Sequence, residues 1–141
     1  GHRGSRNDRS CVLRISDGVS SVLLTGDIER RAERLLVGRY GGALRSNVMI
    51  VPHHGSNTSS SQLLLDVVQP DIAIVSRGAS NRFGHPRAAV VRRYEEKRVI
   101  WLDTAEQGAI LVKVEQGRVN WRPWAGTQIR FWHSHQRGLM R

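Results

Sequence analysis

The sequence predicts an α/β fold in which helices pack on a mixed β-sheet. Three observations predict it. Apolar runs rich in β-branched residues recur along the chain, segments with helical spacing separate them, and Gly, Pro, Ser or Asp residues bound most runs. The expected order is hairpin, helix, strand, helix, strand, helix, strand, hairpin. The 141 residues are a one-domain length, long enough for a real core.

The first expected element is a β-hairpin formed by residues 10–15 and 21–24, because Asp17-Gly18 between them is a strong turn signal. Residues 28–37 follow with apolar residues at helical spacing, which predicts a helix directly after the second strand. The apolar face of this helix is expected to consist of Ile28, Ala32, Leu35 and Leu36.

Residues 48–51 form an almost continuous apolar run, which is typical of a strand covered on both faces and ended here by Pro52. The Asn, Thr and Ser residues at 57–61 offer N-caps for a short helix over about 62–68. Asp71 precedes a further predicted strand over 72–75.

A long polar loop at residues 79–86 comes next, and Pro86 is expected to be the first residue of a helix that runs to about Glu95. Residues 99–102 predict another short strand. The apolar and polar residues then alternate on both sides of Gln116-Gly117, which predicts a closing hairpin.

Polar residues follow the strands at four loops: Asp27, His53-His54, Asn81 with His85, and Asp103-Thr104. Because ligands bind outside the carboxyl ends of strands in open α/β sheets, we expect these loops to converge on a site. Ordinary structural roles stay open for each residue. Asp27 is also a natural N-cap for the helix after it, and His85 could cap the next one.

The net charge of +10 comes almost entirely from arginine, since Lys97 and Lys113 are the only lysines. Arginine binds phosphate in a bidentate manner, so the charge suits a nucleic-acid or other phosphate partner, although a codon bias toward arginine explains it equally well. The single cysteine, Cys11, lies in an apolar run and is expected to be a small buried residue. No run of eighteen or more apolar residues is present.

Several motifs together resemble the metallo-β-lactamase-like domain of the ComEC-type DNA-uptake channel proteins of naturally competent bacteria. The motifs are LLTGD at 23–27, VPHHGS at 51–56 and NRFGHP at 81–86, with NDRSCVL at 7–13 and TAEQGAI at 104–110 in support. The resemblance covers about residues 7–115. It implies the fold of a four-layer αββα sandwich with a two-metal site at one edge of its sheets, of which this chain would be the C-terminal half.

The resemblance also implies roles for individual residues. Asp27 matches the aspartate that bridges two metal ions, and His85 is the best candidate for a second metal ligand. His53 or His54 would handle the substrate phosphate, one facing the cleft and the other supporting the loop, because neighbours on an extended segment point to opposite sides. The remaining site candidates are Glu29 as an acid/base group, and Ser56 and Asn81 as neutral substrate-binding groups.

The superfamily's strongest motif, His-x-His-x-Asp-His, is absent. The similar spacing at His133-Ser134-His135 is followed by Arg137 and Gly138, so we interpret it as accidental. We therefore expect three regions: residues 1–6, a remnant of expression or loose lead-in; residues 7–122, a partial domain; and residues 123–141, a basic aromatic tail. A partial domain would bind metal weakly or not at all, would not hydrolyse substrate alone, and would self-associate through exposed apolar sheet surface.

The function implied by the resemblance is a nuclease that uses two divalent ions, Zn or Mn, to degrade the DNA strand that is not imported. Its expected partners are the phosphate backbone of single-stranded DNA and the rest of the membrane channel protein. The expected location is a soluble domain on the outer face of a bacterial inner membrane. Two alternatives remain open: a non-catalytic DNA-binding module, and a metallo-hydrolase that acts on another phosphoester.

Overall fold

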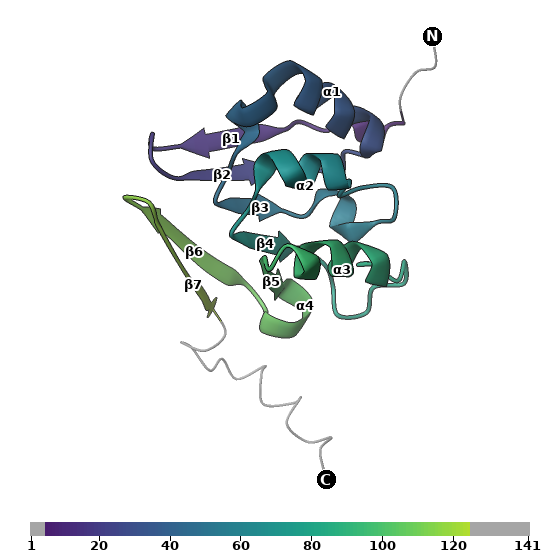
Figure 1. Ribbon diagram of the computed structural model, residues 1–141. Coiled ribbons are helices and arrows are strands. Elements are labelled where there is room, and N and C mark those ends of the chain that lie inside the picture. The colour runs from purple at the N-terminus through teal and green to yellow at the C-terminus, as the bar shows by residue number, and fades with distance from the viewer. Residues whose placement is uncertain (1–4, 125–141) are drawn as a thin grey trace.

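The computed structural model describes residues 5–124. Its central element is a five-stranded sheet in the order β1-β2-β3-β4-β5, in which β1 is antiparallel to β2 and the other neighbours are parallel (Figure 1). The strands are β1 (Leu13–Ser16), β2 (Ser21–Leu24), β3 (Val48–Ile50), β4 (Ile72–Val75) and β5 (Ile100–Asp103). The predicted mixed α/β fold is confirmed.

The helices pack on one face of this sheet and bury the larger part of the core. The α-helices are α1 (Arg30–Tyr40), α2 (Gln62–Val68), α3 (Ala88–Glu96) and α4 (Thr104–Gln107), and the 3₁₀ turns are η1 (Asn7–Arg9), η2 (Gly41–Leu44) and η3 (Pro52–Gly55). Leu64 and Leu65 of α2 and Tyr94 of α3 are fully buried against Met49 and Val75 of the central strands. The helices and the central strands therefore share one core.

The opposite face of the sheet is covered by the hairpin β6 (Ile110–Glu115) and β7 (Arg118–Pro123), which crosses it as a second, smaller layer (Figure 1). The cover is partial. Leu13 and Ile15 on the edge strand β1 are 52% and 54% exposed, and Ile100 on β5 is also exposed. This exposed apolar surface is the kind from which we expect self-association, which stays a prediction. Among the described residues, no helix has the length and apolar character needed to cross a membrane.

Both hairpins, the three predicted strands that correspond to β3, β4 and β5, and the Ser61 cap of α2 are confirmed by the structure. Three expectations are wrong. Leu35 points to solvent, 66% exposed, whereas Glu33 on the same helix is buried, because its carboxylate accepts hydrogen bonds from the N–H groups of Ser60 and Ser61. Pro86 lies outside α3, whose N-cap is Arg87. Cys11 is exposed, because the chain before β1 runs over the surface.

The sequence also left one helix unpredicted. The single turn α4 begins where the side chain of Asp103 accepts a hydrogen bond from the Ala105 N–H. Most of the predicted basic tail, including His133 and His135, lies outside the described residues.

Candidate functional site

The loops that follow β2, β3 and β4 leave the sheet at the same edge, because the three strands are parallel neighbours. Asp27 follows β2, His53 and His54 follow β3, and the segment from Ser76 to Pro86 follows β4. Thr25 ties the first two loops together by donating to the Ile50 carbonyl at 2.8 Å. The predicted convergence of these loops is therefore present in the structure.

Two glycines allow close backbone approach at this edge, one between the loops after β3 and β4 and one between the loop after β2 and the segment before β1. A Cβ added to Gly55, at φ +80°, would lie 2.5 Å from the Cβ of Pro86. A Cβ added to Gly26, at φ +57°, would lie 2.8 Å from the Cβ of Ser10. Both positions therefore need glycine for backbone conformation and for space.

His53 and His54 occupy a tight turn in which both residues have left-handed backbone conformation, with φ of 48° and 53°. The extended geometry expected for the pair is therefore wrong. Left-handed non-glycine residues cost free energy and cluster at functional sites. In this turn the two rings still have different partners: His54 contacts Ser76 and Asp27, and His53 contacts Glu29.

His54 lies between a backbone carbonyl and a carboxylate. Its Nδ1 is 2.7 Å from the carbonyl oxygen of Ser76, and its Nε2 is 3.5 Å from Oδ1 of Asp27. Because a carbonyl only accepts hydrogen bonds, Nδ1 carries a proton and Nε2 of a neutral ring would direct its lone pair at Asp27. Such a contact becomes favourable when the ring is protonated or when a cation lies between the two groups.

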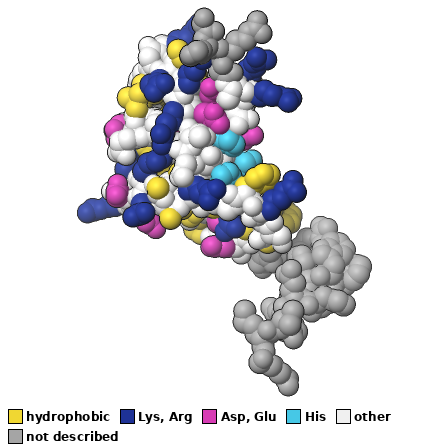
Figure 2. Space-filling model, turned by 90° about the vertical axis from the view of Figure 1, so that its right-hand side faces the viewer, with side chains coloured by type: hydrophobic (Ala, Val, Ile, Leu, Met, Phe, Trp, Pro, Cys, Tyr) yellow, Lys and Arg dark blue, Asp and Glu magenta, His cyan; other side chains and the backbone are white. Residues whose placement is uncertain are grey.

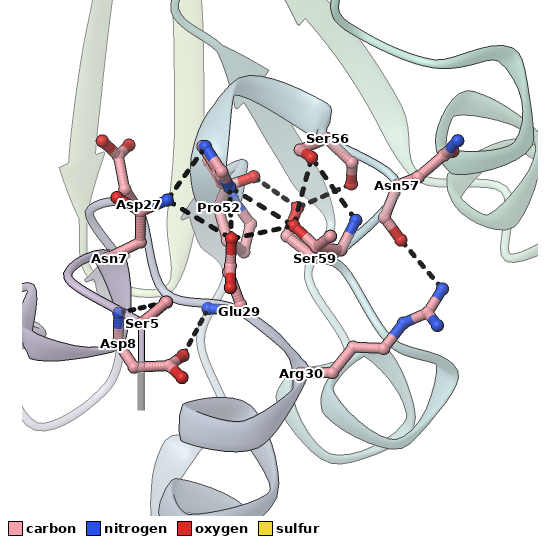
Figure 3. A network of polar contacts seen from close by, with 12 residues as sticks. Ser5, Asn7, Asp8, Asp27, Glu29, Arg30, Pro52, Ser56, Asn57 and Ser59 are labelled. Carbon is pink, nitrogen blue, oxygen red and sulfur yellow. Dashed lines mark hydrogen bonds and ion pairs between the residues drawn. The ribbon is translucent and has the colours of Figure 1, made fainter. Parts of the chain in front are cut away.

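His53 belongs to a separate polar network with Glu29. The Nδ1 of His53 is 3.4 Å from Oε1 of Glu29, and the same carboxylate oxygen accepts from the Thr58 hydroxyl at 3.1 Å. The Asn7 amide lies 3.3 Å from both Glu29 Oε1 and His53 Nε2 (Figure 3). Three segments far apart in sequence, around Asn7, Glu29 and residues 53–58, thus meet at one half-buried imidazole.

The sequence reasoning missed Asn7 and Thr58 as members of this site. Asn7 lies in a stretch that reads as polar surface, and Thr58 lies in a run of helix-capping residues. Asn7 begins the NDRSCVL motif, which was the available signal for it, whereas Thr58 lies outside the quoted motifs. The backbone of Glu29 is fixed in turn by Asp8, whose carboxylate accepts from the Glu29 N–H at 3.1 Å (Figure 3).

The third histidine, His85, faces the other two. Its ring centroid is 6.0 Å from that of His53, and its Nδ1 is buried without a hydrogen-bond partner. Burial, and after it the positive charges of Arg87 and the two other histidines, hold the pKa of His85 below its usual value. A neutral imidazole with an unshared lone pair is the form that binds metal ions.

The histidine side chains form one group beside acidic side chains on the surface of the molecule (Figure 2). Asp27, Glu29, His53, His54 and His85 are therefore brought together, and Asp27 is not the cap of α1, since Glu29 holds that position. The two neutral candidates are engaged elsewhere. Ser56 is buried and bonded to the Thr58 hydroxyl, and Asn81 donates to the His85 carbonyl within its own loop.

The fourth strand-end loop contributes an ion pair to the edge of the site. Arg77 donates to the buried carboxylate of Asp103 at 2.7 Å, and Thr104 exchanges hydrogen bonds with the backbone of Arg77. The Asp103-Thr104 pair therefore acts on the site through Arg77, by holding the loop that supplies the Ser76 carbonyl to His54.

The donors at this edge fit a divalent metal ion in kind. Asp27 supplies a carboxylate, His54 has its Nδ1 held by a carbonyl in the manner of metal-binding histidines, and His85 has an unpartnered nitrogen. Within residues 5–124, no group of three or more His, Cys, Asp or Glu side chains is arranged closely enough to hold a metal.

Comparison with known proteins gives an independent view of the chain. Residues 2–79 match the model of the Metallo-beta-lactamase superfamily. Curated relatives include Competence protein ComA of Neisseria gonorrhoeae, 42% identical over 113 residues, and Uncharacterized protein YcaI of Escherichia coli strain K12, 40% identical over 112 residues. Recombination protein 2 of Haemophilus influenzae is 37% identical over 125 residues.

The matches cover most of this chain and a small part of each relative. They span 80%, 79% and 84% of the chain, and 16%, 15% and 16% of the three relatives in the same order. The chain therefore corresponds to about a sixth of the length of the proteins it matches.

Proposed function

This chain belongs to the metallo-β-lactamase superfamily and is related to ComEC-type competence proteins, and from this premise we propose that it forms part of a two-metal phosphodiesterase site. Its substrate would be DNA, the strand that is not imported during natural transformation. The family match and the competence relatives support a role in DNA uptake.

The observation that carries the proposal is the position of His54 between Ser76 and Asp27. The carbonyl holds the ring with Nδ1 protonated, so Nε2 is free to bind a cation shared with the carboxylate 3.5 Å away. This geometry favours His54, rather than His53, as the metal-binding member of the pair. We assign Asp27, His54 and His85 as metal ligands and leave His53 for the substrate.

A bound pair of divalent ions would activate water and stabilise the charge of a phosphodiester transition state. Three side chains are too few for two ions that each prefer four or more ligands. We therefore propose that further ligands come from a His-x-His-x-Asp-His segment of the parent protein, and that this chain alone is inactive. Zn and Mn both suit the mixed histidine and carboxylate donors.

His53 and Glu29 form a proton-handling pair beside the metal ligands. The carboxylate of Glu29, 3.4 Å from Nδ1, orients the imidazole toward the substrate. The Nε2 atom, whose neighbour is the Asn7 amide at 3.3 Å, would then donate a proton to the leaving oxygen or hydrogen-bond the phosphate. Thr58 and Asn7 act here as positioning residues.

The proposed setting is a domain of a bacterial inner-membrane protein that faces outward, where it would meet the phosphate backbone of single-stranded DNA. The rest of the channel protein is the expected partner. The arginine excess would attract the strand to the domain by long-range electrostatics.

The test is cleavage of end-labelled single-stranded DNA by the intact domain of the parent protein, with Zn²⁺ or Mn²⁺ and with a chelator. We expect metal-dependent cleavage that Asp27→Asn and His85→Ala each reduce at least about 100-fold. Asp66→Asn is the matched control, since Asp66 is an exposed carboxylate that pairs with Lys97 on the helix side of the sheet.

Cleavage that is unchanged in the Asp27 and His85 variants would contradict the ligand assignment. The absence of any metal-dependent cleavage, combined with DNA binding that weakens as salt is added, would instead favour the alternative of a non-catalytic binding module. Cleavage of a small phosphodiester but not of DNA would point to a hydrolase of another phosphoester.

A further inference from the structure

A pocket of about 480 Å³ opens beside His54 and His85, and the proposed metal site does not account for it. It lies between the loop after β4 and the turn after β3. Its lining includes His54, His85, Arg82 and Phe83. A substrate held at the histidines therefore has a second surface within reach.

Phe83 is the most unusual residue of this lining. Its side chain is 63% exposed, although an aromatic ring gains most from burial. One face stacks on His85, with centroids 6.2 Å apart and an angle of 19° between the planes, and the guanidinium carbon of Arg82 lies 5.3 Å from the ring centroid. The structure thus presents an aromatic ring and a cation directly beside the site.

The loop holds this ring in place through Asn81. The side-chain oxygen of Asn81 accepts from the Phe83 N–H at 2.9 Å, and its amide nitrogen donates to the His85 carbonyl at 2.5 Å. One side chain therefore fixes both the aromatic residue and the histidine that it stacks on. This pre-organisation lowers the cost of binding a ligand against the ring.

The pocket contains two arginines, Arg77 and Arg82, which differ in whether their charge is already paired with a carboxylate. Arg77 is paired with Asp103 at 2.7 Å and approaches Glu106 at 3.8 Å, whereas Arg82 forms no ion pair with any residue in the described part of the chain. Arg82 is therefore the cation free to meet an anionic ligand beside the aromatic ring.

We propose that Phe83 is a stacking platform for one nucleobase of a single-stranded nucleic acid, with Arg82 in contact with the adjoining phosphate. This inference rests on the proposed function, because it places a base next to the phosphate handled at the histidines. Every base has a π-face, so stacking on Phe83 should not depend on the nucleotide sequence. An unpaired base is required, since bases in a duplex are stacked on one another.

The experiment measures binding of the 141-residue chain, without metal and with a chelator present, to fluorescein-labelled oligothymidylate of about 12 nucleotides and to an abasic strand of equal length. We expect Phe83→Ala to weaken binding of the thymidylate about 5- to 150-fold and to leave binding of the abasic strand unchanged. Phe83→Trp should retain or improve the affinity.

Tyr40→Ala is the matched control, because Tyr40 is an exposed aromatic ring with Arg39 5.5 Å from its centroid, on the far end of α1. Circular dichroism of each variant verifies its folding. Equal binding of the thymidylate by Phe83→Ala and the unchanged chain would overturn the platform, as would a chain that binds both strands equally or binds neither. Cleavage is not measured here, so failure of this inference is distinct from failure of the proposed phosphodiesterase.

Discussion

His54 directs Nε2 at Oδ1 of Asp27 from 3.5 Å, while the Ser76 carbonyl fixes its other nitrogen at 2.7 Å. The adjacent His53 meets a different carboxylate, Glu29, at 3.4 Å. Two histidines that are neighbours in the chain therefore belong to two separate acid–imidazole pairs. The division follows from the left-handed turn at residues 53 and 54, and it is the basis on which we propose one pair for metal binding and the other for proton transfer.

The first prediction separates these two pairs by metal affinity. In the intact domain, His54→Asn should lower Zn²⁺ affinity at least about 10- to 100-fold, because it removes the nitrogen aimed at Asp27. His53→Asn should leave the affinity within a few-fold of the original, and asparagine tolerates the left-handed backbone at both positions. Competition with a chromophoric chelator measures both. Equal losses of Zn²⁺ affinity in the two variants would contradict the assignment of metal binding to His54 alone of the two.

The contact between Gly55 and Pro86 gives a prediction about stability. Gly55→Ala should lower the free energy of unfolding by about 2 to 5 kcal/mol, since it combines left-handed strain with a Cβ placed 2.5 Å from the Cβ of Pro86. Gly18→Ala is the control, because Gly18 also has positive φ but has no atom within 4 Å of the added Cβ. Urea denaturation should show a clearly smaller loss for Gly18→Ala, and similar losses would mean that the contact is not tight.

Much of the fold was predictable because local patterns and tertiary packing agree. The turn at Asp17-Gly18 and the apolar run at residues 48–51 are confirmed, since turn chemistry and burial on both faces act on a few consecutive residues. The orientation of α1 was not predictable from periodicity. Glu33 takes an interior position that an apolar residue such as Leu35 was expected to hold, because the loop at residues 60 and 61 needs a buried acceptor.

The sequence predicted which strand-end loops form the site, but it did not predict most of the contacts between their side chains. The position of Asp27, His53, His54 and His85 at strand ends follows from sheet topology, which a sequence pattern reveals. The left-handed turn and the partners Asn7, Thr58 and Ser76 depend on long-range backbone placement, for which no local spacing gives a signal.

Glu33 leads to a prediction about the loop that carries Thr58. The side chain is 0% exposed and accepts from the N–H groups of Ser60 at 2.6 Å and Ser61 at 2.8 Å. Glu33→Ala should cost about 2 to 6 kcal/mol of unfolding free energy, because one buried and one part-buried N–H donor lose their acceptor. Glu33→Gln keeps one oxygen and should cost less. Faster amide exchange at residues 60 and 61 would verify the mechanism, whereas unchanged exchange there would contradict it.

Asp17 gives a prediction about acid stability. Hydrogen bonds from the N–H groups of Ser20 and Val19 hold the pKa of this carboxyl below its ordinary value of 3.8. Because the pKa is lower in the folded state, the carboxylate stabilises the first hairpin above the unfolded-state pKa, and this stabilisation is lost as pH falls through the folded value. A carboxyl-carbon NMR titration should give a midpoint below 3.8. A midpoint at or above that value would show that the hairpin bonds are absent in solution.

The proposed proton-handling role of Glu29 predicts a loss of turnover without a loss of metal. In the intact domain, Glu29→Gln should lower kcat for DNA cleavage about 100- to 10,000-fold, because a neutral amide no longer places a negative charge 3.4 Å from the imidazole that would transfer the proton. The bound metal content should stay unchanged, since Asp27 and His54 lie in the other pair. The control is Glu96→Gln, an exposed carboxylate at the end of α3. Equal kcat in the Glu29 and Glu96 variants would leave Glu29 with a structural role only, whereas loss of metal in Glu29→Gln would place this carboxylate among the ligands.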